Sequence, residues 1–486
     1  MHLTRRLLLG GLLATPALRA WGEAPETSIR PAPRAPDFFK QAIPDAEALI
    51  QDARLGGKVS FAIADLAQGD ILEARQPLLT QPPASTTKAL TALYALEALG
   101  PEHRFQTRLI ATGPIANGRI DGDLILAGGG DPTLDTDALA DMAADLKKIG
   151  VREVAGRFRV WDGALPNIRE IDPEQPDHVG YNPAVGGLNL NYNRVHFEWR
   201  RAGGEYTVSM DARSARYQPD VTMARMAVVD RSVPIYTYAD RDGTDAWTVA
   251  KGALGSGGAR WLPVRRPAVY AGEVFRTLAR AHGIQLGGAV GRADGDTGTT
   301  LVTRDSAALP EVLRDMLKYS TNLTAEAVGM AASAKRGGTV RDLVASAGRM
   351  DDWLIERAAL RSPQFVDHSG LGDTSRIHAA DMVKALVSLG PDSGLRPLLK
   401  TYDLDDLPDT KIQAKTGTLN FVAALVGFVT APSGRDMAFA IYCADIPRRD
   451  ALSEAEMDSP PGGVAWVRRA RHLQWQLLSR WSKLYG

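Results

Sequence analysis

The sequence contains a single cysteine, Cys443, among 486 residues. An intrachain disulfide, a cysteine-rich zinc module and an iron–sulfur cluster are therefore excluded. Cys443 lies in the apolar run 437–444, which predicts a buried strand and a structural role for the thiol. The chemistry of this protein must come from hydroxyls, amines, carboxylates or histidines.

The sequence also has no excess of either charge: 57 Lys and Arg balance 57 Asp and Glu, so the formal net charge is zero. A nucleic-acid groove usually needs a basic excess, so we expect no nucleic-acid partner. The sequence has no H-E-x-x-H, no G-x-S-x-G, no P-loop and no G-x-G-x-x-G after a predicted strand. We therefore expect neither a metal nor a cofactor, and structural roles for His368 and His378.

No window reaches 18 uninterrupted apolar residues, so no membrane-spanning helix is predicted. The shorter apolar run 7–14 follows Arg5 and Arg6, and small residues occur at Ala17, Ala20 and Ala24. This layout predicts a cleavable export signal over residues 1–24 and a periplasmic location. The paired arginines leave a twin-arginine route open. The mature protein is expected to be soluble or peripherally associated with the membrane or wall.

The chain is about three times the length of a typical domain, so two or three folding units are expected. Residues 59–72 predict a β-hairpin. The segment that follows Pro82-Pro83, with Leu90, Leu93, Leu96 and Leu99 spaced by three, predicts a helix of about four turns that ends at Gly100. Further helices are predicted at 138–148, 269–281, 309–318, 339–356, 379–389 and 467–484, and strands at 422–429 and 437–444. Between 105 and 263, short alternating segments predict β-structure. We expect one α+β domain, residues 25–104 and 264–486, split by a β-rich insertion at 105–263.

Ser85 and Lys88 stand three residues apart at the start of a predicted helix, so both side chains project from one face. A serine hydroxyl is a poor nucleophile unless a nearby base removes its proton. A lysine can be that base only if burial or neighbouring cations lower its pKa. S-x-x-K alone is a weak signal, since a capping serine and a solvated lysine match it equally well.

Two other short motifs follow in order. Ser320 and Asn322 come after an apolar helix, where a hydroxyl and an amide could relay a proton and hold a lysine or a carbonyl. Lys415-Thr416-Gly417-Thr418 precedes a predicted strand, and Gly417 would let a ligand backbone approach closely. Each motif is common by chance, but the ordered set is specific.

The set S-x-x-K, S-x-N and K-T-G resembles the penicillin-binding proteins and serine β-lactamases. Ser320 follows Ser85 by 235 residues, which is similar to the class C low-molecular-mass penicillin-binding proteins, the D-alanyl-D-alanine carboxypeptidase/endopeptidase family (peptidase family S13). The segments 83–88, 122–134, 189–193, 367–371 and 415–419 support this resemblance. It implies a β-lactamase/transpeptidase-like domain, an antiparallel sheet with helices on both faces.

The resemblance also implies a serine enzyme acting on peptidoglycan stem peptides, with β-lactams as covalent inhibitors. Ser85 would attack the carbonyl of the penultimate D-alanine while Lys88 takes its proton. The oxyanion would lie between the N–H groups of Ser85 and Thr418, and Ser320 would pass a proton to the departing amine.

The remaining site residues are likewise implied by the resemblance. Lys415 and Asn322 would fix the local field. Thr416 and Thr418 would bind the terminal carboxylate beside Gly417, and Arg376 would contact the third residue of the stem peptide.

This sequence departs from the family pattern at two places. His368 replaces a glycine in Asp367-His-Ser-Gly-Leu371, and Ser375-Arg376 follow two residues later than in the family. No recognition acid can be aligned in the insertion, where Asp172 and Asp177 are candidates. The sequence therefore leaves the balance of carboxypeptidase and endopeptidase activity open. It also gives no indication of the oligomeric state.

Two alternatives remain. A β-lactamase would need a base for the deacylating water, but no E-x-x-L-N segment lies between Asn322 and Lys415, and Glu326 is interpreted as an ordinary helix residue. A catalytically silent peptidoglycan-binding module is disfavoured because all three motifs are intact.

Overall fold

The computed structural model describes residues 43–404 and 406–486. Pro44–Gly486 form one compact unit. The predicted export signal, residues 1–24, lies outside the described residues, as does the beginning of the predicted catalytic domain. No helix in the described part of the chain has both the length and the apolar character needed to cross a membrane.

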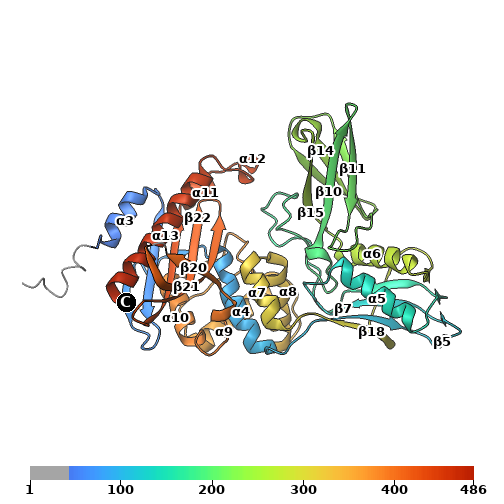
Figure 1. The fold of residues 1–486 in the computed structure, drawn as a ribbon, viewed down its shortest axis with the longest axis horizontal. Coiled ribbons are helices and arrows are strands. Elements are labelled where there is room, and N and C mark those ends of the chain that lie inside the picture. Colours follow the sequence, from blue (N-terminus) through green and yellow to red (C-terminus); the bar gives the residue numbers. More distant parts are fainter. Residues whose placement is uncertain (1–42, 405) are drawn as a thin grey trace, which may run out of the picture. The chain divides into compact units, whose positions relative to one another are not determined.

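A six-stranded sheet joins the two ends of the described chain (Figure 1). Its order is β2-β1-β23-β22-β21-β20, and every neighbouring pair is antiparallel. The strands are β1 (Lys58–Asp65), β2 (Ile71–Arg75), β20 (Lys400–Leu404), β21 (Leu407–Leu419), β22 (Val422–Thr430) and β23 (Asp436–Ala444). All eight residues of β1 pair with β23, so the carboxy-terminal half completes the sheet.

Alternate residues of β1 enter two different cores, one on each face of the sheet. Phe61 and Ile63 lie in a core with Trp481, whereas Ala62 and Ala64 lie in the other. The first core contains residues of α3 (Ala46–Ala53) and α13 (Gly463–Tyr485), and the second contains residues of α4 (Thr87–Leu99), α7 (Leu309–Tyr319), α8 (Asn322–Arg336), α9 (Leu343–Ala358) and α10 (Ala379–Leu389). The predicted α+β fold with helices on both faces is confirmed.

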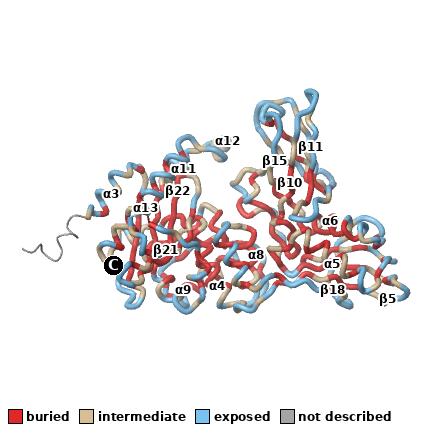
Figure 2. The backbone as a smooth tube through the Cα atoms, in the orientation of Figure 1, coloured by how far each residue is buried: buried red, intermediate tan, exposed pale blue. Residues whose placement is uncertain are grey.

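Buried residues follow the strands of this sheet (Figure 2). Strands β22 and β23 are almost continuously buried because helices cover both faces. Cys443 is fully buried in β23, and burial raises the pKa of its thiol to about 12. The thiol therefore packs as a small apolar group.

Two short helices, α11 (Ile446–Asp450) and α12 (Glu454–Met457), connect β23 to α13.

The inserted part has its own core, which extends from Leu109 to Val302. Its strands form sheets in the orders β17-β9-β7-β4-β18, β16-β8-β6-β5, β11-β10-β15 and β12-β14-β13. These strands are β4 (Gln106–Ala111), β5 (Ile115–Ala116), β6 (Arg119–Ile120), β7 (Leu124–Gly128), β8 (Glu153–Val154), β9 (Phe158–Trp161), β10 (Arg194–Ala202), β11 (Glu205–Asp211), β12 (Ala224–Val229), β13 (Tyr236–Arg241), β14 (Thr244–Ala250), β15 (Gly257–Pro263), β16 (Gln285–Leu286), β17 (Gly291–Arg292) and β18 (Thr299–Asp305). The helices are α5 (Thr136–Lys148) and α6 (Pro267–Ala281).

The sequence-based boundary at 263/264 falls inside this inserted core. Strand β18 pairs antiparallel with β4, and Phe275 of α6 packs against Phe158 with ring centroids 5.4 Å apart. Residues up to Asp305 therefore pack with the insertion. The sequence pattern does not reveal this, because a change from strand to helix at 267 resembles a change of domain.

Helix α8 is not singled out by the apolar pattern, although it carries the second motif. Its buried face consists largely of small residues such as Ala325, Gly329, Ala332 and Ser333. Small residues let a helix approach its neighbours closely, but they give little apolar periodicity. The predictions for helices α6, α7 and α10 and for the hairpin β1–β2 match the structure. Helix α4 begins at Thr87, after a separate 3₁₀ turn, and α9 begins later than expected, where Asp342 accepts a hydrogen bond from Ala345 N.

Candidate active site

Ser85 lies in a single 3₁₀ turn, Ala84–Thr86, that leads directly into α4. Ala84 holds a φ of 47°, a conformation that costs energy for a residue with a side chain. Lys88 follows one turn later, and its Nζ lies 3.0 Å from Ser85 Oγ. Ser85 lines a cavity of about 1040 Å³. The predicted projection of both side chains from one helix face is thus present.

The amine of Lys88 is fully buried and has three oxygen partners. Besides Ser85 Oγ, it donates to Asn322 Oδ1 at 2.7 Å and to Ser369 O at 2.8 Å. Burial lowers the pKa of Lys88 to about 8, against the opposing effect of the carboxylates of Glu326 and Asp367. About a tenth of this amine is therefore neutral at pH 7, compared with roughly one part in 3000 for a lysine at its ordinary pKa of 10.5.

Ser320 and Asn322 stand at the junction of α7 and α8. Ser320 ends α7 in the left-handed conformation, with φ 59° and ψ 40°, and Asn322 begins α8. Lys415 Nζ donates to Ser320 Oγ at 3.0 Å, while Asn322 Nδ2 donates to Tyr181 O at 2.9 Å. The amide of Asn322 thereby links Lys88 to the inserted part.

The third motif lies on β21, which passes directly beside the turn that carries Ser85. A Cβ on Gly417 would come within 2.7 Å of Pro83 O and 3.1 Å of Ser85 N, so only glycine allows this approach. Lys415 is almost fully buried; burial, with a contribution from the charge of Lys88, lowers its pKa well below the usual range. Thr418 is exposed and lines the cavity. Thr416 O accepts a hydrogen bond from Lys415 Nζ at 2.7 Å.

Two fully buried carboxyls lie behind these groups. Glu326 Oε2 and Oε1 accept the N–H groups of His368 and Ser369 at 2.9 and 2.8 Å. Asp367 accepts the N–H groups of Gly370 and Gly372, both at 2.6 Å. Burial raises the pKa of both carboxyls, that of Glu326 to about 8. Sequence reasoning treats Glu326 as an ordinary helix residue, since nothing local marks its contacts with residues more than 40 positions away.

His368, His378 and Arg376 do not line the cavity. His368 Nε2 lies 2.7 Å from Ser346 Oγ, and burial lowers the pKa of its imidazole to about 3, so the ring is neutral. His378 Nδ1 lies 3.1 Å from Asp381 Oδ2. Arg376 donates to Asp373 O and Ser375 O and is not a cavity-lining residue.

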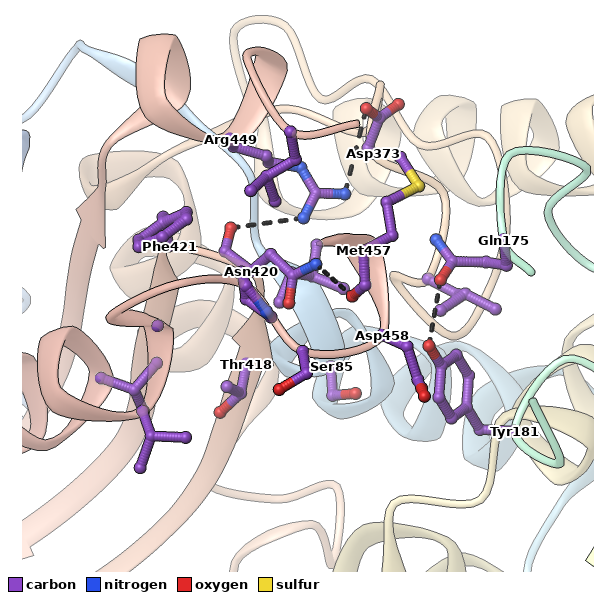
Figure 3. Close-up of a pocket in the computed structure, with 18 of the residues that line it drawn as sticks. Ser85, Gln175, Tyr181, Asp373, Thr418, Asn420, Phe421, Arg449, Met457 and Asp458 are labelled. Atoms are coloured by element: carbon purple, nitrogen blue, oxygen red, sulfur yellow. Dashed lines mark hydrogen bonds and ion pairs between the residues drawn. The ribbon is translucent and has the colours of Figure 1, made fainter. Parts of the chain in front are cut away.

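One cavity wall comes from the inserted part, through Glu174, Gln175 and Tyr181 (Figure 3). The two candidate recognition acids lie beside this wall. Asp172 accepts the side-chain amide of Gln175 at 2.8 Å, and Asp177 lies 3.8 Å from Arg265. Neither lines the cavity.

The opposite wall comes from the end of β21 and from the chain after β23 (Figure 3). Arg449 lies 3.9 Å from Asp373 Oδ2 and donates to Asn420 O at 3.3 Å. Asn420 Nδ2 donates to Met457 O at 2.8 Å. Val467, Arg468 and Arg471 of α13 complete the wall. Sequence reasoning does not find this wall, because no motif marks it.

Among the described residues, no cluster of three His, Cys, Asp or Glu side chains is arranged to hold a metal ion. The groups at the cavity could support acyl transfer: a hydroxyl lies beside a buried amine, a second hydroxyl lies beside a second amine, and a strand passes beside the turn that carries Ser85.

Two D-alanyl-D-alanine carboxypeptidases are similar to this chain in sequence. A D-alanyl-D-alanine carboxypeptidase of Actinomadura sp. (strain R39) is 29% identical over 446 residues, which cover 82% of this chain and 80% of the relative. The D-alanyl-D-alanine carboxypeptidase DacB of Haemophilus influenzae is 24% identical over 427 residues, covering 81% of this chain and 87% of the relative.

Solved structures share the fold. The crystal structure of penicillin-binding protein 4 (DacB) from Haemophilus influenzae superposes with a TM-score of 0.74 at 19% identity, and covers 90% of this chain and 100% of that chain. The sequence model of the D-Ala-D-Ala carboxypeptidase 3 (S13) family matches residues 43–459. The chain therefore belongs to the D-Ala-D-Ala carboxypeptidase 3 (S13) family of peptidases.

Proposed function

We propose that this protein is a serine DD-peptidase that releases the terminal D-alanine of peptidoglycan stem peptides through an acyl-enzyme on Ser85. The observation that carries the proposal is the contact of Ser85 Oγ with Lys88 Nζ at 3.0 Å, in a cavity that Ser320 and Asn322 also line. A serine hydroxyl, a buried amine of lowered pKa and a second hydroxyl–amine pair are the groups that such a reaction needs.

The hydrogen bonds of Lys88 support its role as the base. A neutral amine has two N–H groups and one lone pair. Asn322 Oδ1 and Ser369 O can accept the two N–H groups, so the lone pair points at Ser85 Oγ. The Ser85 hydroxyl then donates to Lys88, and its proton passes to Nζ as Oγ attacks the carbonyl carbon.

The acyl-enzyme forms and breaks with a balanced proton count. The N–H groups of Ser85 and Thr418 stabilise the oxyanion, and the amide C–N bond breaks as Ser320, held by Lys415, supplies a proton to the departing amine. Ser320 is reprotonated with the proton that Lys88 took from Ser85, so Lys88 is neutral again before deacylation. A water then attacks the ester. Its proton passes to Lys88, the acyl group leaves as a carboxylic acid, and Ser85 Oγ regains its proton.

Cleavage of D-alanine cross-links is a second activity that the cavity favours. Its volume of about 1040 Å³ is at the upper end of small-molecule pockets, and it is bounded by Glu174 and Tyr181 of the inserted part. This space would accept a second peptide beyond the scissile bond. Product analysis on cross-linked muropeptides separates the two activities.

A β-lactamase is less well supported. Both oxygens of Glu326 accept main-chain N–H groups, and the residue does not line the cavity. Glu326 is therefore not placed to activate a deacylating water, and we propose that β-lactams leave a slowly hydrolysed adduct on Ser85. The Haemophilus influenzae penicillin-binding protein 4 has a solved complex with a β-lactam, which is consistent with this proposal.

Intact-mass analysis after exposure to penicillin tests the proposal. We expect one adduct in the wild type and none in Ser85→Ala, with loss of D-alanine release from an acyl-D-Ala-D-Ala peptide. Ser433→Ala, in the exposed turn between β22 and β23, is the control and should keep the adduct. An equal adduct in Ser85→Ala, or none in the wild type, would overturn the mechanism. Rapid turnover of the drug would identify a β-lactamase instead.

We also propose that residues 1–24 direct the protein to the periplasm. Amino-terminal sequencing of protein from a periplasmic extract should find a chain that begins after Ala20 or Ala24. Recovery of the intact leader in the cytoplasmic fraction alone would contradict export.

A further inference from the structure

Helix α13 brings an arginine to the strand that carries the third motif. Arg471 Nη2 donates to Thr418 Oγ1 at 3.2 Å, and both residues line the cavity. Arg468, one turn earlier on the same helix face, lines it as well. The intervening Arg469 points elsewhere, and its Nε donates to Ala53 O at 3.1 Å.

Arg471 differs from Arg480 and Lys483 of the same helix in its charge environment. Arg480 and Lys483 pair with Glu73 and Asp406, both at 2.6 Å. Among the described residues, no carboxylate lies within 4.0 Å of the Arg471 guanidinium. The positive charge of Arg471 therefore faces the cavity without an acidic partner in this part of the chain.

The nearby lysine is less suited to bind an anion. Lys415 Nζ already donates to Ser320 Oγ and Thr416 O, and burial lowers its pKa well below the usual range. A guanidinium stays charged at every accessible pH and has five N–H donors in a planar fork. Arg471 uses one of these donors on Thr418, so others remain for a bidentate contact with a carboxylate.

We propose that Arg471, together with the Thr418 hydroxyl, binds the carboxylate of the residue on the leaving side of the scissile bond. Arg471 thereby selects substrates whose leaving amine carries a free carboxylate. This inference rests on the proposed DD-peptidase function, since it assigns the recognition of that reaction's leaving group. The carboxylate would displace solvent from an arginine that is exposed in the free protein.

A substrate pair measures this contact directly. The pair is an acyl-D-Ala-D-Ala peptide and the same peptide with a carboxy-terminal amide, compared in the wild type and in Arg471→Ala. We expect Arg471→Ala to lower kcat/KM for the free acid by about 10- to 100-fold, the range for a hydrogen bond between charged groups. The rate on the amide should stay within about twofold, because a neutral amide gains little from the guanidinium charge.

Penicillin and its methyl ester provide a second pair, read as the rate of adduct formation by intact mass, that does not depend on turnover. Arg471→Ala should slow acylation by the acid and leave the ester almost unchanged. Arg469→Ala is the matched control on the same helix and should keep the preference for the acid. Arg471→Gln, which preserves most of the side chain's packing, should repeat the loss seen in Arg471→Ala.

The outcomes separate this inference from the proposed function. Equal losses on the acid and the neutral partner would assign Arg471 a purely structural role and overturn the inference, as would an undiminished preference for the acid in Arg471→Ala. Either result leaves the Ser85 adduct of the wild type intact. A wild type that forms no adduct contradicts the DD-peptidase function itself.

Discussion

Lys88 Nζ and Ser369 O lie 2.8 Å apart although 281 positions separate the two residues in the chain. The N–H of the same Ser369 donates to Glu326 Oε1 at 2.8 Å. A continuous path therefore runs from the Glu326 carboxyl through the backbone of one residue, Ser369, to the amine beside Ser85. Glu326 is a positioning residue for Lys88, because it holds the residue whose carbonyl orients the amine.

Substitution of Glu326 tests this path. Glu326→Gln keeps the side-chain volume but replaces one acceptor oxygen with an N–H₂ group that faces a main-chain N–H. We expect acylation by penicillin to slow by about 10-fold or more. Because the Glu326 carboxylate raises the pKa of Lys88, its loss should also shift the pH at half-maximal acylation rate downward.

A matched control exists in the inserted part. Glu273 is also buried, and its carboxyl accepts the N–H groups of Thr222 and Met223. Glu273→Gln should lower stability without moving the pH profile of acylation. An unchanged pH midpoint in Glu326→Gln would show that Glu326 contributes only to folding.

The acylation rate should itself report the pKa of Lys88. Only the neutral amine can accept the Ser85 proton, so the rate should rise by about tenfold per pH unit below the pKa and level off above it. The pKa of about 8 places the plateau above pH 8, whereas an ordinary lysine, at 10.5, would still be gaining activity at pH 10. Rapid-mix intact-mass measurements between pH 6 and 10 give this profile. Lys88→Arg, which keeps the charge but cannot act as the base, should lose activity at every pH, and a rate still rising at pH 10 would contradict the prediction.

Two helix glycines should respond to alanine in opposite ways. A Cβ on Gly329 of α8 would lie 2.1 Å from Cγ of the fully buried His368, whereas a Cβ on Gly348 of α9 meets nothing within 4 Å. Gly329→Ala should destabilise the protein by about 2 kcal/mol or more through overpacking. Gly348→Ala should stabilise it by about 0.5–1 kcal/mol, the usual preference for alanine in a helix. Chemical unfolding of both variants measures the difference, and a change of the same sign in both would refute this account of the α8–His368 contact.

Much of the main domain could be predicted from the sequence because its elements are locally periodic. Alternating residues of β1 and the apolar runs of β22 and β23 predict strands, and Gly100 marks the end of α4. The boundary of the inserted part is harder to predict from the sequence. Strand β18 belongs to the inserted part because it pairs with β4, and the paired segments are almost 200 residues apart in the chain. Apolar periodicity does not predict helix α8, because small residues form much of its buried face.

Some contacts of the candidate site could likewise be predicted from local spacing, and others could not. The spacing of Ser85 and Lys88 predicts their contact, since three residues on a helix return a side chain to the same face. The partners of Asn322 are of another kind. The motif predicts an amide that could hold a lysine or a carbonyl, and the structure identifies these groups as Lys88 and Tyr181 O of the inserted part, which no local pattern specifies.

Composition and motifs define which chemistry is available to this protein. One cysteine and the absence of metal-binding motifs left hydroxyls and amines, and three ordered motifs placed them on a helix start, a helix junction and a strand. Contacts between distant segments tune those groups: Lys88 is buried, the carboxyl of Glu326 lies behind it, and Arg471 donates a hydrogen bond to Thr418. The reason is physical: a pKa and a binding preference depend on desolvation and on charges a few ångströms away, which distant parts of the chain supply.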